Sequence, residues 1–278
     1  MKTGIIAWCH QQIHHWLPNA CLWCGLPVQQ ADSQLCDFCQ DDLPRVSMDI
    51  VDFNALALPA IARGLQQHRF QQLLCLSWYQ QPWQHWIGQW KFQQDLACGE
   101  ALLQQFAVAC RLWRATLKVD AVCYVPMHAR RLRQRGFNQA EQLATVAAAQ
   151  LQLPLLQLFM VNTETPHQVG LNRQQRRANL RKQFRLRPKV AIPAKVLLID
   201  DVVTTGATVN TLCRLLGKHG VQHIAVACLA VTKAPGTTAE LYLQDLRHSS
   251  SPSPPSSCLL KAFAKNSALT NIRPEPTK

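Results

Sequence analysis

Long apolar runs are missing from this chain of 278 residues. Even the apolar stretch Ala225–Val231 is far shorter than the about 20 residues that a transmembrane helix requires. Near the amino terminus, the polar residues His10, Gln11 and Gln12 interrupt the apolar residues before a secretory hydrophobic region forms. We therefore expect a cytoplasmic protein without membrane insertion.

Acidic residues are also scarce, because 16 Asp and Glu stand against 29 Lys and Arg, for a formal net charge of +13. The surplus is local: residues 126–189 hold 12 Lys and Arg but only Glu141 and Glu164. A concentrated positive charge favours an anionic partner, either nucleic acid or a ligand with phosphate groups. The length is sufficient for one substantial core with a small accessory module.

Twelve cysteines do not indicate a disulfide scaffold, since the chain is long and no export signal is evident. Four of them form two CxxC pairs, and two such pairs complete the tetrahedral sulfur shell that Zn²⁺ favours. Gly25 follows the first pair, where a tight turn is expected. We expect a structural zinc ion, with an iron–sulfur cluster or a redox dithiol as alternatives, and buried thiols for the other eight cysteines. The expected ligands are Cys21, Cys24, Cys36 and Cys39.

Composition and hydrophobic pattern divide the chain into four segments. Residues 15–50 form a four-cysteine, zinc-ribbon-like module, and residues 55–118 are expected to be mainly helical. Residues 119–232 alternate short apolar runs with helical patterns, which predicts an α/β domain with a parallel sheet. Residues 233–278 contain a Ser/Pro tract and are expected to be a disordered tail. The predicted strands are 121–125, 155–161, 195–199 and 223–231, and the predicted helices are 138–151 and 208–219, with helical spacing also in 93–113.

An acidic, threonine-rich turn follows the apolar run 196–199. Asp200 and Asp201 lie at the carboxyl end of this predicted strand, where open α/β sheets bind their ligands. Residues 204–208 (Thr-Thr-Gly-Ala-Thr) then open a helix, and their amides, hydroxyls and helix dipole suit a phosphate. The carboxylates would face sugar hydroxyls or a shared Mg²⁺ instead. The alternative is a plain strand end and helix cap, and the absence of a GxxxxGK[ST] run argues against a P-loop nucleotidase.

Arginines follow the strand predicted at 121–125. Because parallel strands end at the same edge of a sheet, we expect Arg130 and Arg131 to lie near the phosphate turn and to face a pyrophosphate. The long connection 173–189 is expected to act as a mobile lid. For the outer residues Arg133, Arg135 and 181–189, a solvated cationic face and a nucleic-acid footprint are equally open.

Several motifs occur together in an order that resembles a known family. The segment 196–208 closely resembles the 5-phosphoribosyl-1-pyrophosphate (PRPP) signature of type I phosphoribosyltransferases. The four-cysteine module and residues 125–139 (Val-Pro-Met-His-Ala-Arg-Arg-Leu-Arg-Gln-Arg-Gly-Phe-Asn-Gln) precede it. Together they resemble the ComF/GntX family over roughly residues 15–232. Tyr79–Pro82, Lys91–Phe92 and Arg173–Leu180 are also similar to this family, the first two to its hood region.

The resemblance implies a type I phosphoribosyltransferase-like parallel sheet with helices on both faces. It also implies that residues 55–118 form the hood region. It implies that Asp200 and Asp201 hold the ribose 2′- and 3′-hydroxyls, in the presence of Mg²⁺. The 5′-phosphate would be held by Thr204, Thr205, Gly206, Ala207 and Thr208. The candidates for stabilising departing pyrophosphate are Arg130, Arg131, Arg173 and Arg177.

Two functions are compatible with these motifs. The first is a phosphoribosyltransferase-like protein that binds PRPP and Mg²⁺ and transfers or recognises a phosphoribosyl group, in the cytoplasmic stage of DNA uptake and use of extracellular DNA. The second is a non-catalytic, single-stranded-DNA-binding competence protein with PRPP or a nucleotide as a regulatory ligand. Other DNA-uptake proteins are expected partners in both.

Overall fold

The computed structural model describes residues 19–28, 30, 33–65, 68–161 and 183–234. Part of the expected lid, with Arg173 and Arg177, lies outside these residues, and so does nearly all of the expected tail, 233–278.

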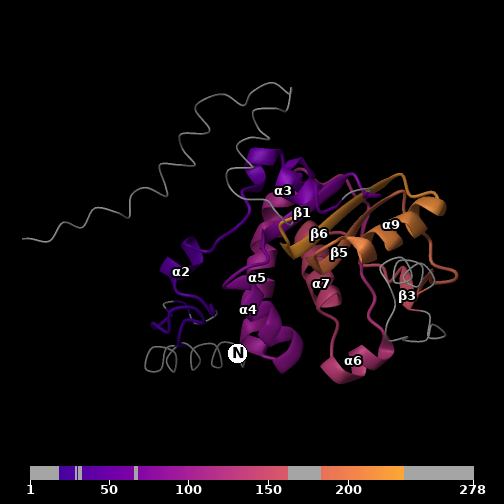
Figure 1. Ribbon diagram of the computed structural model, residues 1–278. Coiled ribbons are helices and arrows are strands. Elements are labelled where there is room, and N and C mark those ends of the chain that lie inside the picture. Colours follow the sequence, from indigo (N-terminus) through magenta and orange to yellow (C-terminus); the bar gives the residue numbers. More distant parts are fainter. Residues whose placement is uncertain (1–18, 29, 31–32, 66–67, 162–182, 235–278) are drawn as a thin grey trace, which may run out of the picture. The chain divides into compact units, whose positions relative to one another are not determined.

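A four-stranded parallel sheet forms the centre of the fold, with the strand order β1-β6-β5-β2. Figure 1 labels β1, β6 and β5, which lie side by side. Its strands are β1 (Gln72–Trp78), β2 (Ala121–Tyr124), β5 (Lys195–Val203) and β6 (His223–Val231). Every residue of β6 after its first is buried, as expected of a parallel strand covered on both faces. The predicted α/β class with a parallel sheet is confirmed.

Three long helices cover the sheet: α5 (Leu96–Trp113), α7 (Gln139–Leu151) and α9 (Ala207–Lys218). Helices α5 and α7 pack against each other, and α7 also packs on β2 and β5. The connection from β1 to β2 crosses the sheet in one direction, and the connection from β5 to β6 runs the opposite way. Right-handed crossovers therefore place α9 on the face opposite α5. Both faces of the sheet are covered by helices, as predicted.

Most of the described residues in the segment 55–118 are helical, as predicted, but the segment also contains β1, an edge strand of the central sheet that the sequence did not indicate. Its residues Leu73–Leu76 are all buried, so the strand lacks the alternation that distinguishes a half-buried strand from a helix. The region therefore shares the core of the α/β domain. The short helix η1 (Met48–Val51) precedes this segment. The other elements of the segment are η2 (Ala55–Ala57), α3 (Pro59–Ala62), α4 (Trp83–Gly88) and the π-helical turn η3 (Gln89–Gln93).

The strand predicted at 155–161 is also only partly correct. Leu155 makes a single parallel bridge with Val122, and a tight turn follows, in which the Leu158 N–H donates to the Leu156 carbonyl. The chain then forms β3 (Phe159–Val161), which pairs antiparallel with β4 (Phe184–Leu186) in a separate two-stranded sheet. The other predicted strands and helices are confirmed to within a few residues, although β5 extends through Val203 and so includes the acidic pair.

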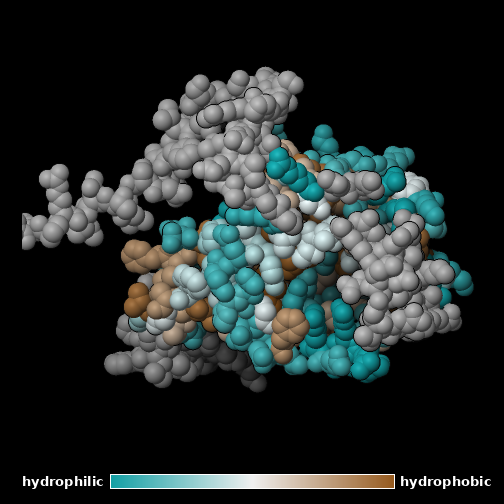
Figure 2. All heavy atoms as spheres, in the orientation of Figure 1, coloured by the Kyte–Doolittle hydropathy of each residue, from teal (hydrophilic) through white to brown (hydrophobic). Residues whose placement is uncertain are grey.

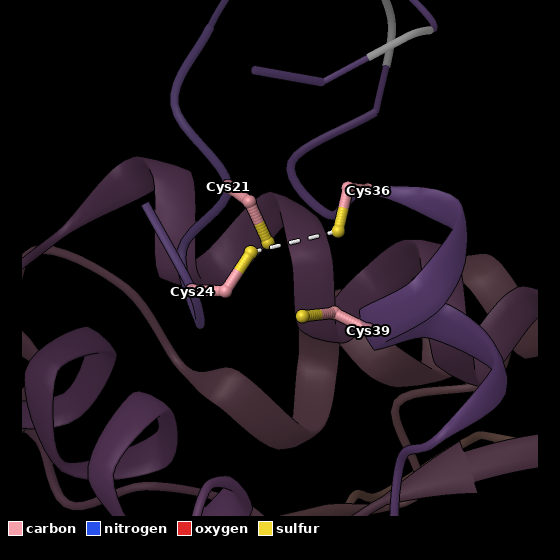
Figure 3. A group of neighbouring side chains, drawn as sticks. All are labelled: Cys21, Cys24, Cys36 and Cys39. Carbon is pink, nitrogen blue, oxygen red and sulfur yellow. Dashed lines mark hydrogen bonds between the residues drawn. The ribbon is translucent and has the colours of Figure 1, made fainter. Parts of the chain in front are cut away.

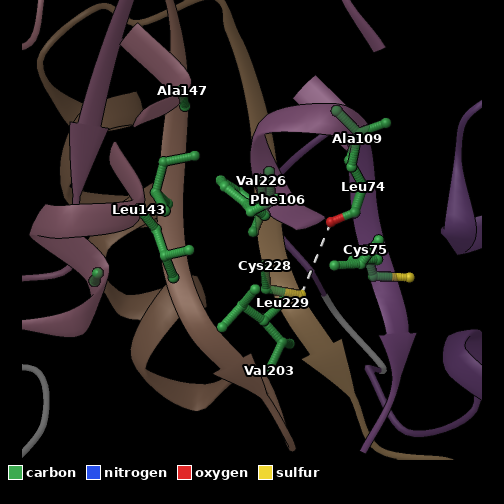
Figure 4. Close-up of a cluster of buried hydrophobic side chains, with 14 of the residues drawn as sticks. Leu74, Cys75, Phe106, Ala109, Leu143, Ala147, Val203, Val226, Cys228 and Leu229 are labelled. Carbon is green, nitrogen blue, oxygen red and sulfur yellow. Dashed lines mark hydrogen bonds between the residues drawn. The ribbon is translucent and has the colours of Figure 1, made fainter. Parts of the chain in front are cut away.

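The core between sheet and helices is apolar and rich in cysteine (Figure 4). Burial raises the pKa of the Cys75 and Cys110 thiols to about 12, so these thiols stay protonated and unreactive at neutral pH. The prediction of buried thiols outside the cluster is confirmed for Cys75, Cys98, Cys110, Cys123, Cys213 and Cys228, whereas Cys9 and Cys258 lie outside the described residues.

Candidate functional site

Four cysteine sulfurs converge in the amino-terminal module (Figure 3). Cys21 and Cys24 lie on a turn that closes with a hydrogen bond from the Cys21 N–H to the Leu26 carbonyl, 2.8 Å long. Gly25 has the positive φ of 75° that this turn requires. Cys36 precedes α2 (Asp37–Asp41) as its N-cap, and Cys39 follows one turn later. Two local structures, a turn and a helix start, thus present two sulfurs each.

The cluster has the size of a tetrahedral metal site. Its sulfurs all lie within 4.8 Å of one another, and the Cys24 and Cys36 sulfurs are 3.6 Å apart. Zinc–sulfur bonds of about 2.3 Å in a tetrahedron separate the sulfurs by about 3.8 Å. Burial acts to raise the pKa of the Cys21 thiol, but N–H groups of Cys24, Cys36 and Trp23 lower it to about 6, which favours the thiolate that binds metal. The cluster can therefore hold a metal ion, and its geometry is consistent with structural zinc.

The cysteine module is attached to the helices that cover the sheet. The Trp23 indole packs edge-on against Trp86 of α4, with ring centroids 6.1 Å apart. Gln34 donates a hydrogen bond of 3.1 Å to the Glu100 carboxylate on α5. A metal ion held by the four cysteines would therefore stabilise a module that packs on α4 and α5.

A cleft of about 390 Å³ lies at the carboxyl ends of β2 and β5. It contains both acids of the signature, together with Thr208 from the start of α9 and Arg131 from the basic segment. The structure therefore brings the acidic turn and the basic segment together, as their positions after parallel strands predicted. Its polar lining residues are Lys91, His128, Arg131, Arg135, Asn138, Gln183, Asp200, Asp201 and Thr208.

The two acids are held by the backbone at the end of β5. Asp200 Oδ1 accepts the Asp201 N–H at 2.9 Å, and Asp201 Oδ1 accepts the Val202 N–H at 2.6 Å. Asp201 Oδ2 makes an ion pair with Lys91 Nζ at 2.8 Å, and both side chains are mostly buried, at 17% and 15% exposed. The two carboxyl groups are thus oriented before any ligand arrives.

The Asp200 carboxyl has an unusual proton affinity. Burial, followed by the neighbouring Asp201 charge, raises its pKa to about 8, although the backbone hydrogen bond and Lys91 oppose the increase. Asp200 therefore remains largely protonated at neutral pH in the free protein. A ligand or cation that favours the carboxylate must release this proton on binding.

The turn from Thr204 to Thr208 leads into the amino terminus of α9. Gly206 adopts a left-handed φ of 65° as the N-cap, and a β-carbon there would lie 2.7 Å from Leu65 Cδ2. Thr204 and Thr205 are exposed, whereas Ala207 and Thr208 are half-buried. The first turn of α9 leaves backbone N–H groups without helical partners, and the helix dipole adds positive potential. This arrangement suits a phosphate group.

The basic segment forms the short helix α6 (Ala129–Arg135), which His128 caps through a hydrogen bond from the Arg130 N–H to Nδ1, 3.1 Å long. Arg131 and Arg135 line the cleft, whereas Arg130 and Arg133 are exposed on the helix away from its lining. Hydrophilic side chains gather over this part of the surface (Figure 2). Of the two arginines predicted to face pyrophosphate here, Arg131 is the one in the cleft wall.

Lys91 was not among the residues that the sequence indicated for the site. Its segment was assigned only to the hood, and no local spacing connects it with Asp201, which is distant in the chain. The contact depends on how η3 packs beside the end of β5. A lysine next to an aromatic residue in a hood segment was the only available signal, and it is weak.

The comparisons agree with this fold. Residues 134–249 match the model of the phosphoribosyl transferase domain family. The chain is 33% identical over 171 residues to Competence protein F of Haemophilus influenzae, which covers 59% of this chain and 75% of that protein. It is 31% identical over 225 residues to DNA utilization protein YhgH of Salmonella typhimurium, covering 78% and 98%. It is also 31% identical over 146 residues to Competence protein ComFC of Streptococcus pneumoniae, covering 52% and 62%.

The parallel sheet and the cleft at its carboxyl edge, with this domain match, define a phosphoribosyltransferase-like protein that carries a cysteine module. The chain belongs to the ComF/GntX family of competence and DNA utilization proteins. Among the described residues, none of the helices combines the length and the apolar character needed to cross a bilayer.

Proposed function

We propose that this protein binds PRPP with Mg²⁺ in the 390 Å³ cleft and transfers or recognises its phosphoribosyl group during the cytoplasmic use of imported DNA. The observation that carries the proposal is the convergence on one cleft of the acidic pair, Arg131 and Thr208, which lies in the first turn of α9. The domain match supports a phosphoribosyl ligand, and the names of the relatives support a role in competence or DNA utilization.

The chemistry of each part suits one part of PRPP. Asp200 and Asp201 accept hydrogen bonds from the ribose hydroxyls, and the amides and hydroxyls of residues 204–208 hold the 5′-phosphate. Arg131 faces the pyrophosphate and stabilises its negative charge as the bond to the anomeric carbon breaks. Arg130, and Arg173 and Arg177 from the segment outside the described residues, are further candidates for this role.

Two metal ions accompany the proposal. The oxygen ligands of the acidic pair fit Mg²⁺, which would reduce the repulsion between pyrophosphate and carboxylates. The four cysteines fit a zinc ion that stabilises the amino-terminal module, and they leave no coordination position for a substrate. Zinc therefore acts on the structure and takes no part in the transfer.

Calorimetry with PRPP and Mg²⁺ tests the proposal directly. We expect the wild-type protein to bind, and the double variant Asp200→Asn, Asp201→Asn to lose binding, because amides are weaker acceptors for hydroxyls than carboxylates. The matched control Asp41→Asn, Asp42→Asn removes two adjacent acids far from the cleft and should bind normally. A double variant at 200 and 201 that binds PRPP like the wild type would contradict the proposed site.

Binding of single-stranded DNA is the second candidate function. It is favoured by the exposed arginines Arg130 and Arg133 and by the Phe92 side chain, which is 71% exposed beside Arg135. Cations that follow the backbone and an aromatic ring that stacks on bases are the usual elements of such sites. In this case PRPP or a nucleotide would regulate DNA binding.

The salt dependence of DNA affinity distinguishes arginines that contact DNA phosphates from arginines that are only exposed to solvent. If DNA binds here, the affinity for an oligonucleotide should fall steeply with ionic strength, and Arg130→Ala with Arg133→Ala should reduce the slope by about two phosphate contacts. The control is Arg111→Ala with Arg114→Ala on exposed positions near the end of α5. Equal slopes for the two double variants would exclude α6 as the DNA surface.

A further inference from the structure

Lys91 is a cation that the cleft holds against one of its own carboxylates. Its ammonium lies 2.8 Å from Asp201 Oδ2, and the remaining oxygen of Asp201 already accepts the Val202 N–H. Both oxygens of this acid are therefore engaged in the free protein. A ribose hydroxyl that donates to Asp201 Oδ2 must displace the ammonium or share the oxygen with it.

The segment that carries Lys91 is held firmly against the cleft. The Trp90 ring stacks on Phe137 with centroids 5.7 Å apart, and it lies so close to Gly99 that a β-carbon there would approach Trp90 Nε1 to 2.5 Å. On the other side of Lys91, the Phe92 ring lies 5.2 Å from the Arg135 guanidinium. Buried Trp90 thus anchors η3 next to the cleft, and the long side chain of Lys91 can change its partner without movement of this anchor.

A displaced ammonium needs a new anionic partner within reach of its flexible stem. PRPP provides one, because its pyrophosphate is attached to the carbon next to the one that bears the 2′-hydroxyl. Lys91 and Arg131 line the same cleft, so an anion between them would be approached by both cations. Ribose 5-phosphate has the same hydroxyls and 5′-phosphate but lacks this pyrophosphate.

We propose that Lys91 is an exchangeable counter-ion, which neutralises Asp201 in the free protein and transfers to the pyrophosphate when the ribose hydroxyls take its place. The inference rests on the proposed function of the cleft and goes beyond it, because it makes Lys91 the residue that selects the pyrophosphorylated sugar over the unmodified one. Sugar phosphates without pyrophosphate compete with Lys91 for Asp201 Oδ2 and offer the ammonium no new anionic partner.

This exchange predicts effects of opposite sign on two ligands. Lys91→Met keeps a side chain of similar length and removes its charge. We expect the variant to bind PRPP about tenfold more weakly, since it loses one charge-assisted contact, and to bind ribose 5-phosphate more tightly, by about threefold to tenfold, since Asp201 is then free. A lysine that only attracts anions from a distance would weaken both ligands on removal.

The experiment is calorimetry of both ligands at constant Mg²⁺, with wild type, Lys91→Met, Lys91→Arg and the control Lys118→Met. Lys118 is exposed and lies before the amino-terminal end of β2, whereas the cleft lies at the carboxyl end of this strand. The variant Lys118→Met makes the same change in net charge as Lys91→Met. Lys91→Arg keeps the cation and should retain the preference for PRPP. It also keeps the test valid if the methionine variant folds poorly, because a loss of this preference in Lys91→Arg would contradict the exchange.

The outcomes separate the two proposals. Wild-type binding of PRPP with opposite shifts in Lys91→Met supports the exchange. Wild-type binding with both ligands shifted in the same direction, or shifted no more than in Lys118→Met, overturns the exchange and leaves the proposed function standing. Absence of PRPP binding by the wild-type protein overturns the proposed function and the exchange together.

Discussion

The raised pKa of Asp200 predicts that the stability of the free protein changes with pH. The substitution Asp200→Asn replaces the carboxyl by a neutral amide of the same shape. Burial and the Asp201 charge raise the pKa of Asp200 from 3.8 to about 8. Between these values the folded protein retains a proton that the unfolded chain has lost. Protonated Asp200 therefore contributes stability that is fully present below pH 3.8 and is lost as the pH rises through about 8.

The size of the effect follows from the raised pKa and from the surroundings of the carboxyl. The difference between the folded and unfolded pKa values corresponds to an upper limit of about 6 kcal/mol, at about 1.4 kcal/mol for each pH unit. The side chain keeps partial contact with solvent and has Lys91 nearby, so we expect about 2 kcal/mol to be lost between acidic and alkaline pH. For a domain of this size, that corresponds to about 4–8 °C in Tm.

The assay is thermal unfolding of wild type and Asp200→Asn from pH 5 to pH 9, without PRPP or Mg²⁺. The amide has no proton to lose, so the Tm of the variant minus that of the wild type should increase with pH through this window. Asp42→Asn at an exposed position is the control, with a difference that stays nearly constant. A constant difference for Asp200→Asn as well would refute the argument that burial makes this carboxyl a weak acid.

Two further predictions concern the metal module and the phosphate turn. The purified protein should contain about one zinc ion per chain, measured by metal analysis. The double variant Cys21→Ser, Cys36→Ser should lose this zinc, whereas Cys98→Ala, outside the cluster, should retain it. An unchanged zinc content in the double variant would contradict the assignment. Gly206→Ala should destabilise the fold by about 2 kcal/mol and weaken PRPP binding. Alanine disfavours a φ of 65°, and its methyl group would push against buried Leu65. An unchanged Tm and an unchanged affinity for PRPP would show that the turn tolerates a side chain.

Short-range features of this protein were predictable from the sequence alone. The CxxC pairs, the turn at Gly25 and the order of strand, acids, turn and helix around Asp200 each depend on residues within a few positions of one another. Backbone geometry and hydrogen bonds between near neighbours determine such features, so spacing is a sufficient guide. The same holds for the buried thiols, which lie among apolar residues.

The strand β1 shows where this local guidance ended. Gln72–Trp78 has an apolar run without alternation, and nothing in it distinguishes a strand covered on both faces from a piece of buried helix. Its assignment depends on β6, more than a hundred residues later in the chain, which supplies the hydrogen-bonding partner. A non-local pairing of this kind is not encoded in the spacing of its residues.

The sequence by itself determined that the chain has a four-cysteine cluster and an acidic, phosphate-type turn at the end of a parallel strand. The tertiary structure alone decided which residues from other segments meet them. It brought Lys91 onto Asp201 and Arg131 into the cleft lining, while Arg130, one position earlier, lies outside it because neighbouring residues of a helix point in different directions. These contacts depend on how distant elements pack, and packing is a property of the whole core.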